Sequence, residues 1–410
     1  MLTILIAILT TGFILDLFLN IINNRHRVKV LPDELKDVYN DEQYAKSAAY
    51  EDANSRLDLF KSAFSFVLTL VMILTGAFAA IDAWTHTITS DFLYAALLFF
   101  GVLFIGSDIL GLPFSIYKTF VIEEKFGFNR TTPSLFIMDK IKGYLLAIFL
   151  GGSLLALFIL FYQLTGKSFW IYAWITFSVV SMLLSMFYTS VILPLFNKLT
   201  PMQPGELRES IEDYCQRAGF KLDNLFIMDG SKRSSRANAF FSGLGAKKKI
   251  VLFDTLVQNH SNEELVAVLA HEVGHYKRKH TRTTLILSVL QMGLMLFLLS
   301  WFIEDPAIAA AFGGEGKSFV LGLLGFTILY TPVSLITSLA MNVLSRKHEY
   351  EADTFAATTY KSEPLQKALK KLSADNLSNL TPHPWYVFFY YSHPTLLQRL
   401  RALRAVASVK

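Results

Sequence analysis

Two histidines with a glutamate between them form the most chemically informative pattern in the chain. The segment LVAVLAHEVGHYKRKH, residues 265–280, contains His271, Glu272 and His275. Side chains four residues apart lie on one face of an α-helix, so both imidazole rings can bind one metal ion while the glutamate beside them takes a proton from water. The pattern therefore predicts a zinc site with the chemistry for cutting peptide bonds.

The flanking residues predict that this segment is helical. Ser261 followed three residues later by Glu264 is a capping-box pattern, and apolar residues recur after it at helical spacing. On one continuous helix His280 would lie opposite His271, so we do not expect it to bind the metal. On this segment alone, the alternative of an amphipathic helix whose histidines bind no metal stays open.

A third ligand is needed because catalytic zinc usually has three protein ligands and one open position. A histidine at position 281 would complete one common arrangement, but the residue there is threonine. The downstream segment SRKHEYEAD offers Glu349 and Asp353, which share a helix face, so one can bind the metal while the other orients a ligand histidine. His348 is an alternative ligand, whereas Glu351 falls on the opposite face and is expected to be a solvated charge.

The rest of the sequence places these residues in a membrane protein. Of the 410 residues, 53% are hydrophobic and 14% are aromatic, which is more apolar surface than one soluble core needs. A membrane-spanning helix takes about 20 apolar residues. Asp16 and Asp108 lie inside apolar windows, so each is expected to face a water-filled interior or a partner on another helix. Seven windows have the required length, at approximately 2–22, 62–82, 92–112, 143–164, 170–196, 284–303 and 318–344.

Charge and cysteine content exclude other classes of protein. The net charge is +5, but Lys and Arg form no dense stripe with aromatic residues, so we do not expect nucleic acid as a partner. The single cysteine, Cys215, excludes an internal disulfide framework and a multi-cysteine zinc site, and it is expected to be a small buried residue. The expected partners are the lipid bilayer and a peptide or protein substrate.

The distribution of Lys and Arg predicts the orientation in the membrane. The loops around 83–91, 165–169 and 304–317 contain only Lys167 and Lys317, so the other basic residues collect in alternate segments. Basic loops stay in the cytoplasm, so we expect seven passes with the N-terminus outside and the C-terminus in the cytosol.

Two polar segments on the cytosolic side predict a split soluble domain. The first contains a helix (GELRESIEDYCQRAGF), a strand (NLFIMDG) and a hairpin from NAFFSG to KKIVLFD across LGAK, followed by the helix with the two histidines. The expected borders are 1–196 for a membrane domain of five helices, 197–283 and 345–410 for the two parts of a zinc protease domain, and 284–344 for helices six and seven.

Several motifs together resemble one known family. LAHEVGH and SRKHEYEAD, with DGSKRSSRANAFFSGLGAKKKIVLFDTL before them and YYSHPTLLQRLRAL after them, are similar to motifs of the type I CAAX prenyl protease (Ste24-like) family, the integral-membrane zinc proteases of peptidase family M48. LPFSIYKTFVIEEKFGFNRTT resembles the membrane-domain signature of that family. The resemblance implies a mainly α membrane protein in which seven helices enclose a chamber, with a split cytosolic α+β zinc protease domain of the gluzincin type.

The resemblance also implies roles for individual residues. Glu349 would be the third ligand of one Zn²⁺ per chain, beside the two histidines of the HEVGH motif, and Asp353 would support a ligand. His393 would stabilise the oxyanion, and Arg399 would organise the carboxylates near the zinc. An edge strand with Asn238, Ala239 and Phe240 would pair with the backbone of the substrate.

The substrate stays open at this point. The family implies endoproteolysis near the C-terminus of prenylated Cys-a-a-X proteins, but relatives with this architecture occur in bacteria, where membrane-protein quality control is the alternative role. A non-enzymatic multi-span transporter or scaffold is a further alternative. The expected location is the inner membrane for a bacterial protein and the endoplasmic reticulum membrane for a eukaryotic one. The sequence leaves the oligomeric state open, with a monomer favoured.

Overall fold

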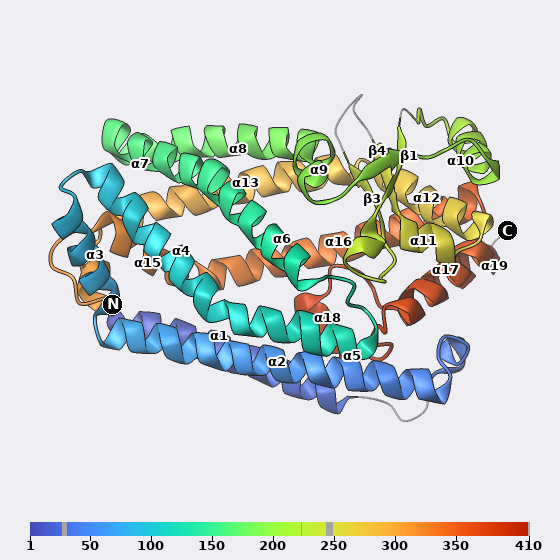
Figure 1. Cartoon of the computed structure of the whole chain (residues 1–410), viewed down its shortest axis with the longest axis horizontal. Helices are drawn as coiled ribbons and strands as arrows, with labels where there is room; N and C mark the ends of the chain where they lie inside the picture. The colour runs from blue at the N-terminus through green and yellow to red at the C-terminus, as the bar shows by residue number, and fades with distance from the viewer. Residues whose placement is uncertain (27–30, 223, 243–248, 409–410) are drawn as a thin grey trace.

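Long helices dominate the computed structural model, which describes residues 1–26, 31–222, 224–242 and 249–408. Figure 1 shows them running along the long axis of the molecule, with α1 and α2 along one edge and α7, α8 and α13 along the other. A small sheet and several shorter helices gather at the end that holds the C-terminus. The long helices are α1 (Leu2–Arg25), α2 (Asp41–Leu74), α4 (Phe92–Tyr117), α6 (Pro133–Leu146), α7 (Ser153–Thr165), α8 (Phe169–Phe187), α13 (His280–Phe302), α15 (Phe319–Leu329) and α16 (Thr331–Thr359).

Length and apolar composition distinguish the candidate membrane helices from the other helices. Five helical segments within the described ranges are long and apolar enough to cross a membrane, and a sixth consists of α15 and α16, which meet at a bend of 47°. One of the five, Pro133–Phe196, is 64 residues long and reverses at Gly166, where the backbone has φ +51° and α8 turns back against α7. The five segments are Leu2–Arg25, Asp41–Leu74, Phe92–Glu123, Pro133–Phe196 and His280–Phe302.

The predicted span at 62–82 is wrong in its borders. A capping box between Asn40 and Gln43 starts α2, so this one helix includes the polar stretch before the apolar window. The helix ends at Leu74 because Gly76 adopts a left-handed conformation, with φ +68°, and α3 (Ala77–Ile88) starts directly after it. The apolar window therefore belongs to two helices that meet at a glycine.

Both acidic residues in the apolar windows have partners on other helices, as predicted. Tyr390 donates a hydrogen bond to Asp16. Asp108 accepts hydrogen bonds from Tyr144 and from the Lys140 ammonium, whose Nζ lies 2.6 Å from Oδ1. These hydrogen bonds offset the cost of placing each carboxylate within an apolar helix.

The sheet at the end of the molecule has the strand order β1-β2-β4-β3. Its strands are β1 (Leu199–Pro201), β2 (Leu225–Met228), β3 (Ala239–Ser242) and β4 (Lys249–Phe253). β2 is parallel to β4, while β1 and β3 are antiparallel to their neighbours, so β3 lies at an edge. The predicted strand and hairpin are confirmed, and the predicted turn LGAK lies outside the described residues. β1 escaped prediction because three residues are too short to show an alternating pattern.

Helices from both polar segments share a hydrophobic core with this sheet. They are α10 (Glu206–Arg217), α11 (Asp254–Asn259), α12 (Asn262–Lys277), α17 (Ser362–Asp375) and α19 (Leu396–Ser408). One hydrophobic cluster includes buried side chains between residues 202 and 273 and between residues 356 and 403. Cys215 belongs to this cluster and is buried, as predicted. The two polar segments therefore share a core despite the apolar helices between them.

Polar contacts join this end of the molecule to the membrane helices. Arg233, in the loop before β3, binds Asp139 of α6 with two nitrogens, at 2.7 and 2.8 Å. Three residues further on, Arg236 binds Glu123 at the end of the α4 segment and donates to the hydroxyl of Tyr50 on α2. The loop that leads into the edge strand is thus anchored on three membrane helices.

Candidate active site

Helix α12 carries the two histidines and the glutamate of the HEVGH motif. Its capping box is confirmed, because the Ser261 hydroxyl accepts from the backbone of Glu264 and the Glu264 carboxylate accepts from the backbone of Ser261. Gly274 faces α16, and a Cβ added there would lie 3.0 Å from the Cα of Ala352. The absence of a side chain therefore lets α12 and α16 cross closely beside the motif.

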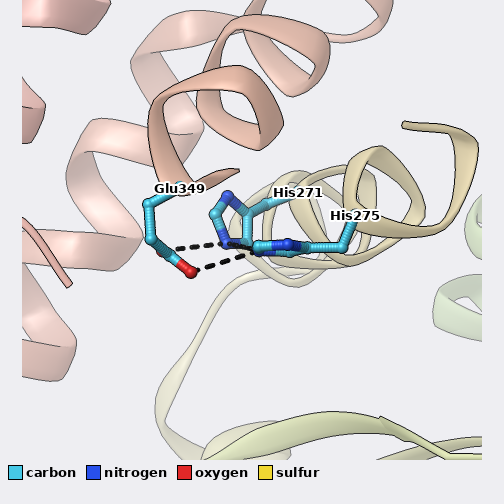
Figure 2. A group of neighbouring side chains, drawn as sticks. All are labelled: His271, His275 and Glu349. Atoms are coloured by element: carbon cyan, nitrogen blue, oxygen red, sulfur yellow. Dashed lines mark hydrogen bonds and ion pairs between the residues drawn. The ribbon is translucent and has the colours of Figure 1, made fainter. Parts of the chain in front are cut away.

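Helix α16 brings Glu349 to the two histidines across this crossing, as Figure 2 shows. The Glu349 carboxylate lies 3.4 Å from His271 Nε2 and 3.2 Å from His275 Nε2. The two histidine Nε2 atoms are 3.1 Å apart. Within the described part of the chain these three residues are the one group of this kind that could hold a metal ion, with one ligand atom from each lying within 4.8 Å of the others.

The protonation pattern at this group fits a bound cation. His271 Nδ1 lies 2.9 Å from Asp353 Oδ1, so it donates there and the neutral ring presents a lone pair at Nε2. Glu349 Oε2 is buried and accepts no hydrogen bond from any described residue. Two imidazole nitrogens and one carboxylate also form a ligand set that zinc prefers. Lone pairs that converge without donors between them indicate a metal site.

Asp353 and Arg399 form a buried pair behind the ligands. Arg399 Nε and Nη2 donate to the two oxygens of Asp353 at 2.8 and 2.6 Å, and Arg399 Nη1 lies 3.5 Å from Glu349 Oε2. Burial opposes the charge of Arg399, but the attraction of Asp353 outweighs it and raises the pKa of the guanidinium.

His393 lies at the open side of the group. Its Nε2 is 3.3 Å from Glu349 Oε1, and its side chain is 62% exposed. Its Nδ1 lies 2.9 Å from the Ser392 hydroxyl. The ring is therefore held next to the ligands while part of it can meet a bound molecule.

A cleft of 320 Å³ opens onto the ligands. Glu272, His393 and Arg399 line it together with Asn238 and Ala239 from the edge strand. Eight of the ten predicted site residues therefore line one cleft, and the two exceptions are Asp353, which is buried behind the candidate ligands, and Phe240. Phe240 points away from the cleft, because its side chain packs against the apolar cluster of Leu193, Met228 and Val251.

The surroundings of His275 differ from the expectations in two respects. α12 ends at Lys277 and a new helix starts at His280, so His280 does not lie on one continuous helix with His271, although in the described structure it is not in the group of candidate ligands. Its Nδ1 lies 3.0 Å from His275 Nδ1. Glu351 is not simply solvated, because its Oε2 lies 2.9 Å from His280 Nε2. The run of basic residues after His275 could have indicated that the helix ends there, since such residues are common in the last turn of a helix.

His348, the alternative third ligand, does not lie with the candidate ligands. The ring of His348 stacks on the ring of His280, with centroids 3.9 Å apart and planes at 9°. In the described structure His348 is not part of the group of candidate ligands. It instead packs on His280, the histidine next to the candidate ligand His275.

The fold and the site together define a multi-pass membrane metalloprotease. Two family models match the chain: "CAAX prenyl protease N-terminal, five membrane helices" over residues 4–198, and "Peptidase family M48" over residues 201–407. The chain therefore belongs to peptidase family M48. Membership of a peptidase family favours an enzyme over the transporter or scaffold alternative.

Curated relatives and a solved structure agree with this family. CAAX prenyl protease 1 of Saccharomyces cerevisiae is 36% identical, over 93% of this chain and 90% of the relative. The CAAX prenyl protease 1 homolog of Oryza sativa subsp. japonica is 37% identical, over 97% and 96%. The crystal structure of S. mikatae Ste24p matches with a TM-score of 0.92 and 36% identity, over 98% of each chain.

Proposed function

We propose that this protein is a zinc endopeptidase that holds one Zn²⁺ with His271, His275 and Glu349. The observation that carries the proposal is the convergence of these three side chains in a cleft that Glu272 also lines. When bound, zinc supplies Lewis acidity, which polarises a carbonyl group and makes water more acidic. Three protein ligands leave a coordination position open, as in catalytic zinc sites.

The remaining chemistry belongs to side chains around the ligands. Glu272 takes a proton from the attacking water and returns it to the leaving amine. His393 donates a hydrogen bond to the carbonyl oxygen on which negative charge develops, a role supported by its position at the open side of the site. Asp353 holds the ring of His271, and Arg399 fixes the two carboxylates relative to each other.

The edge strand β3 is the proposed binding place for the peptide backbone. β3 pairs with β4 on one side and is the last strand of the sheet among the described residues. Asn238 and Ala239 line the cleft at the start of this strand, while Phe240 packs on the opposite side and holds the strand on the sheet. A peptide that adds to this edge as a further strand reaches the metal ligands.

We propose that the natural substrates carry a prenylated Cys-a-a-X sequence at the C-terminus. The support is the name CAAX prenyl protease 1 that relatives bear at 36% and 37% identity over most of the chain. Quality control of membrane proteins with the same mechanism is the second candidate, because the same candidate ligands and base would act on any peptide that reaches the cleft.

The proposed architecture has seven passes around a chamber and a split gluzincin-type protease domain on the cytosolic side. Pro133–Phe196 has room for two passes of about 20 residues, which raises the six candidate segments to seven. The apolar windows of the five candidate helices bury only 6–17% of their residues, as expected for surfaces that face lipid or an interior space. The shared core of the two polar segments supports the split domain.

A substrate comparison tests this function. Purified protein with one equivalent of zinc should cleave a farnesylated Cys-a-a-X peptide, and a chelator should stop the cleavage. The unprenylated peptide and a misfolded membrane protein are the matched competitors. Equal cleavage of both peptides, or faster cleavage of the misfolded protein, contradicts the prenyl-specific proposal and favours quality control.

A further inference from the structure

We propose that His280 and Glu351 are positioning residues that fix the ring orientation and the proton of His275. The inference rests on the proposed role of His275 as a metal ligand. It assigns a shared task to two side chains outside the HEVGH motif, and it concerns a contact that a continuous helix would not allow.

The backbone between α12 and α13 creates this contact. Lys279 adopts the left-handed conformation, with φ +61°, which is unusual for a residue other than glycine. The chain therefore turns after α12, and α13 starts at His280 with its ring against the ring of His275. The ring centroids are 5.1 Å apart and the planes meet at 75°.

The distances allow one consistent arrangement of protons. His275 Nε2 faces Glu349 and His271, so a metal bound there needs its lone pair and the proton lies on Nδ1. His275 Nδ1 then donates to His280 Nδ1 at 3.0 Å. His280 must carry its own proton on Nε2, which donates to Glu351 Oε2 at 2.9 Å. Each donor in the chain from His275 to Glu351 meets one acceptor.

This arrangement matches the support of the other ligand histidine. His271 Nδ1 donates directly to the buried carboxylate of Asp353, at 2.9 Å. His275 reaches the carboxylate of Glu351 through the intervening imidazole of His280. Both ligand rings thus have a carboxylate behind them, which orients the ring and makes its free nitrogen more basic toward a metal.

Packing holds the intervening ring in place. The His280 side chain is 5% exposed, and its face is covered by the stacked ring of His348. Glu351 is 37% exposed and its second oxygen lies 3.8 Å from Lys347 Nζ. Lys347 itself is 71% exposed and pairs with the Glu351 oxygen that His280 does not use, which makes it a suitable control.

The test measures zinc dissociation from the purified full-length protein with a chromophoric chelator. Glu351→Met and His280→Phe keep much of the volume but remove the acceptor, so each should raise the zinc dissociation constant about 10- to 100-fold. Glu351→Gln offers an amide oxygen to His280 and Lys347→Met leaves the chain of hydrogen bonds intact. Both should stay within about threefold of the wild type.

Thermal unfolding of the chelator-treated proteins separates positioning from a structural role. All four variants should unfold at the wild-type temperature without metal. An unchanged zinc dissociation constant in Glu351→Met overturns the inference. A second contrary result is that Glu351→Gln and Glu351→Met both lose zinc and both unfold at a lower temperature without metal, because this would show a structural role.

A ligand variant distinguishes failure of the inference from failure of the proposed function. His271→Ala should abolish stoichiometric zinc binding. If His271→Ala binds zinc as the wild type does, the proposed metal site is wrong and the inference fails with it. If His271→Ala loses zinc while Glu351→Met does not, the site stands and only the role of Glu351 and His280 is wrong.

Discussion

Glu349 and Asp353 show how neighbouring carboxylates of one helix face take different tasks. Both are buried, with 4% and 1% exposure. Glu349 faces the Nε2 atoms of the two histidines, whereas Asp353 binds His271 Nδ1 and the guanidinium of Arg399. The nitrogen that each carboxylate meets therefore distinguishes a candidate metal ligand from a residue that supports one.

Replacing Glu272 tests the proposed proton transfer. Glu272→Gln keeps the shape of the side chain but cannot take a proton, so we expect kcat to fall by about 10²- to 10⁴-fold. Bound zinc should stay at the wild-type ratio, because Glu272 is not among the candidate ligands in the described structure. Peptidase kinetics and metal analysis of the same preparation check this.

A glutamate elsewhere on α12 provides the control. Glu263 is exposed and pairs with Lys361 outside the cleft, so Glu263→Gln should keep both activity and zinc. Wild-type turnover in Glu272→Gln would show that another group takes the proton.

Cys215 should be unreactive in the folded protein. Burial raises the pKa of its thiol to about 12. A raised thiol pKa keeps the neutral form as pH rises, so at pH 8 the thiolate fraction is about 10⁻⁴, compared with about a quarter for a free thiol. Labelling with iodoacetamide at pH 8 should therefore be very slow in the native protein and complete in denaturant. Fast native labelling would contradict a buried Cys215.

At the scale of elements, the crossing of α12 and α16 sets the spacing of the candidate metal ligands. The histidines are on one helix and Glu349 is on the other, so any separation of the helices separates the ligands. Gly274 lies at the closest approach. A Cβ there would lie 3.1 Å from the backbone oxygen of Ala352 and 3.1 Å from the Cβ of Phe355.

Gly274→Ala should weaken both folding and metal binding. Backbone atoms cannot move aside as a flexible side chain can, so the added methyl group pushes the helices apart. We expect a loss of about 1–3 kcal/mol in stability, as for other overpacked sites, and a smaller amount of zinc per chain. The unfolding temperature and metal content measure these effects.

Gly101 on α4 provides the matched substitution. No atom lies within 4 Å of a Cβ added at Gly101, so Gly101→Ala should lower neither the unfolding temperature nor the zinc content. Equal behaviour of Gly101→Ala and Gly274→Ala would contradict the close crossing.

At the scale of the whole molecule, the proposed orientation places the protease domain in the cytosol. Single cysteines on a Cys215→Ala background test it. Ser90, before α4, should be outside and Arg404, in α19, should be inside, and both side chains are exposed. In sealed vesicles whose outer face is the cytosolic face of the membrane, a membrane-impermeant maleimide should label Arg404→Cys directly and Ser90→Cys only after permeabilisation. The reverse pattern would contradict the assignment from basic loops.

Much of the architecture was predictable because it follows from local patterns of apolar and polar residues. Apolar length indicated the membrane helices, and helical or alternating spacing indicated α10, α12, β2 and the hairpin of β3 and β4. The break at Gly76 was not predictable, because an apolar run looks the same with or without one left-handed residue. Nor was β1, which becomes a strand by pairing with β2.

The sequence by itself determined the chemistry at the site. HEVGH on a capped helix and a second helix with carboxylates four residues apart specify the candidate ligands and the base, because side-chain direction on a helix follows from spacing alone. The tertiary structure decided which carboxylate faces which nitrogen. It also decided that His280 supports His275, since one left-handed residue, Lys279, and a partner 71 positions away in the chain bring these groups together. Such contacts depend on how helices pack, and no local periodicity encodes them.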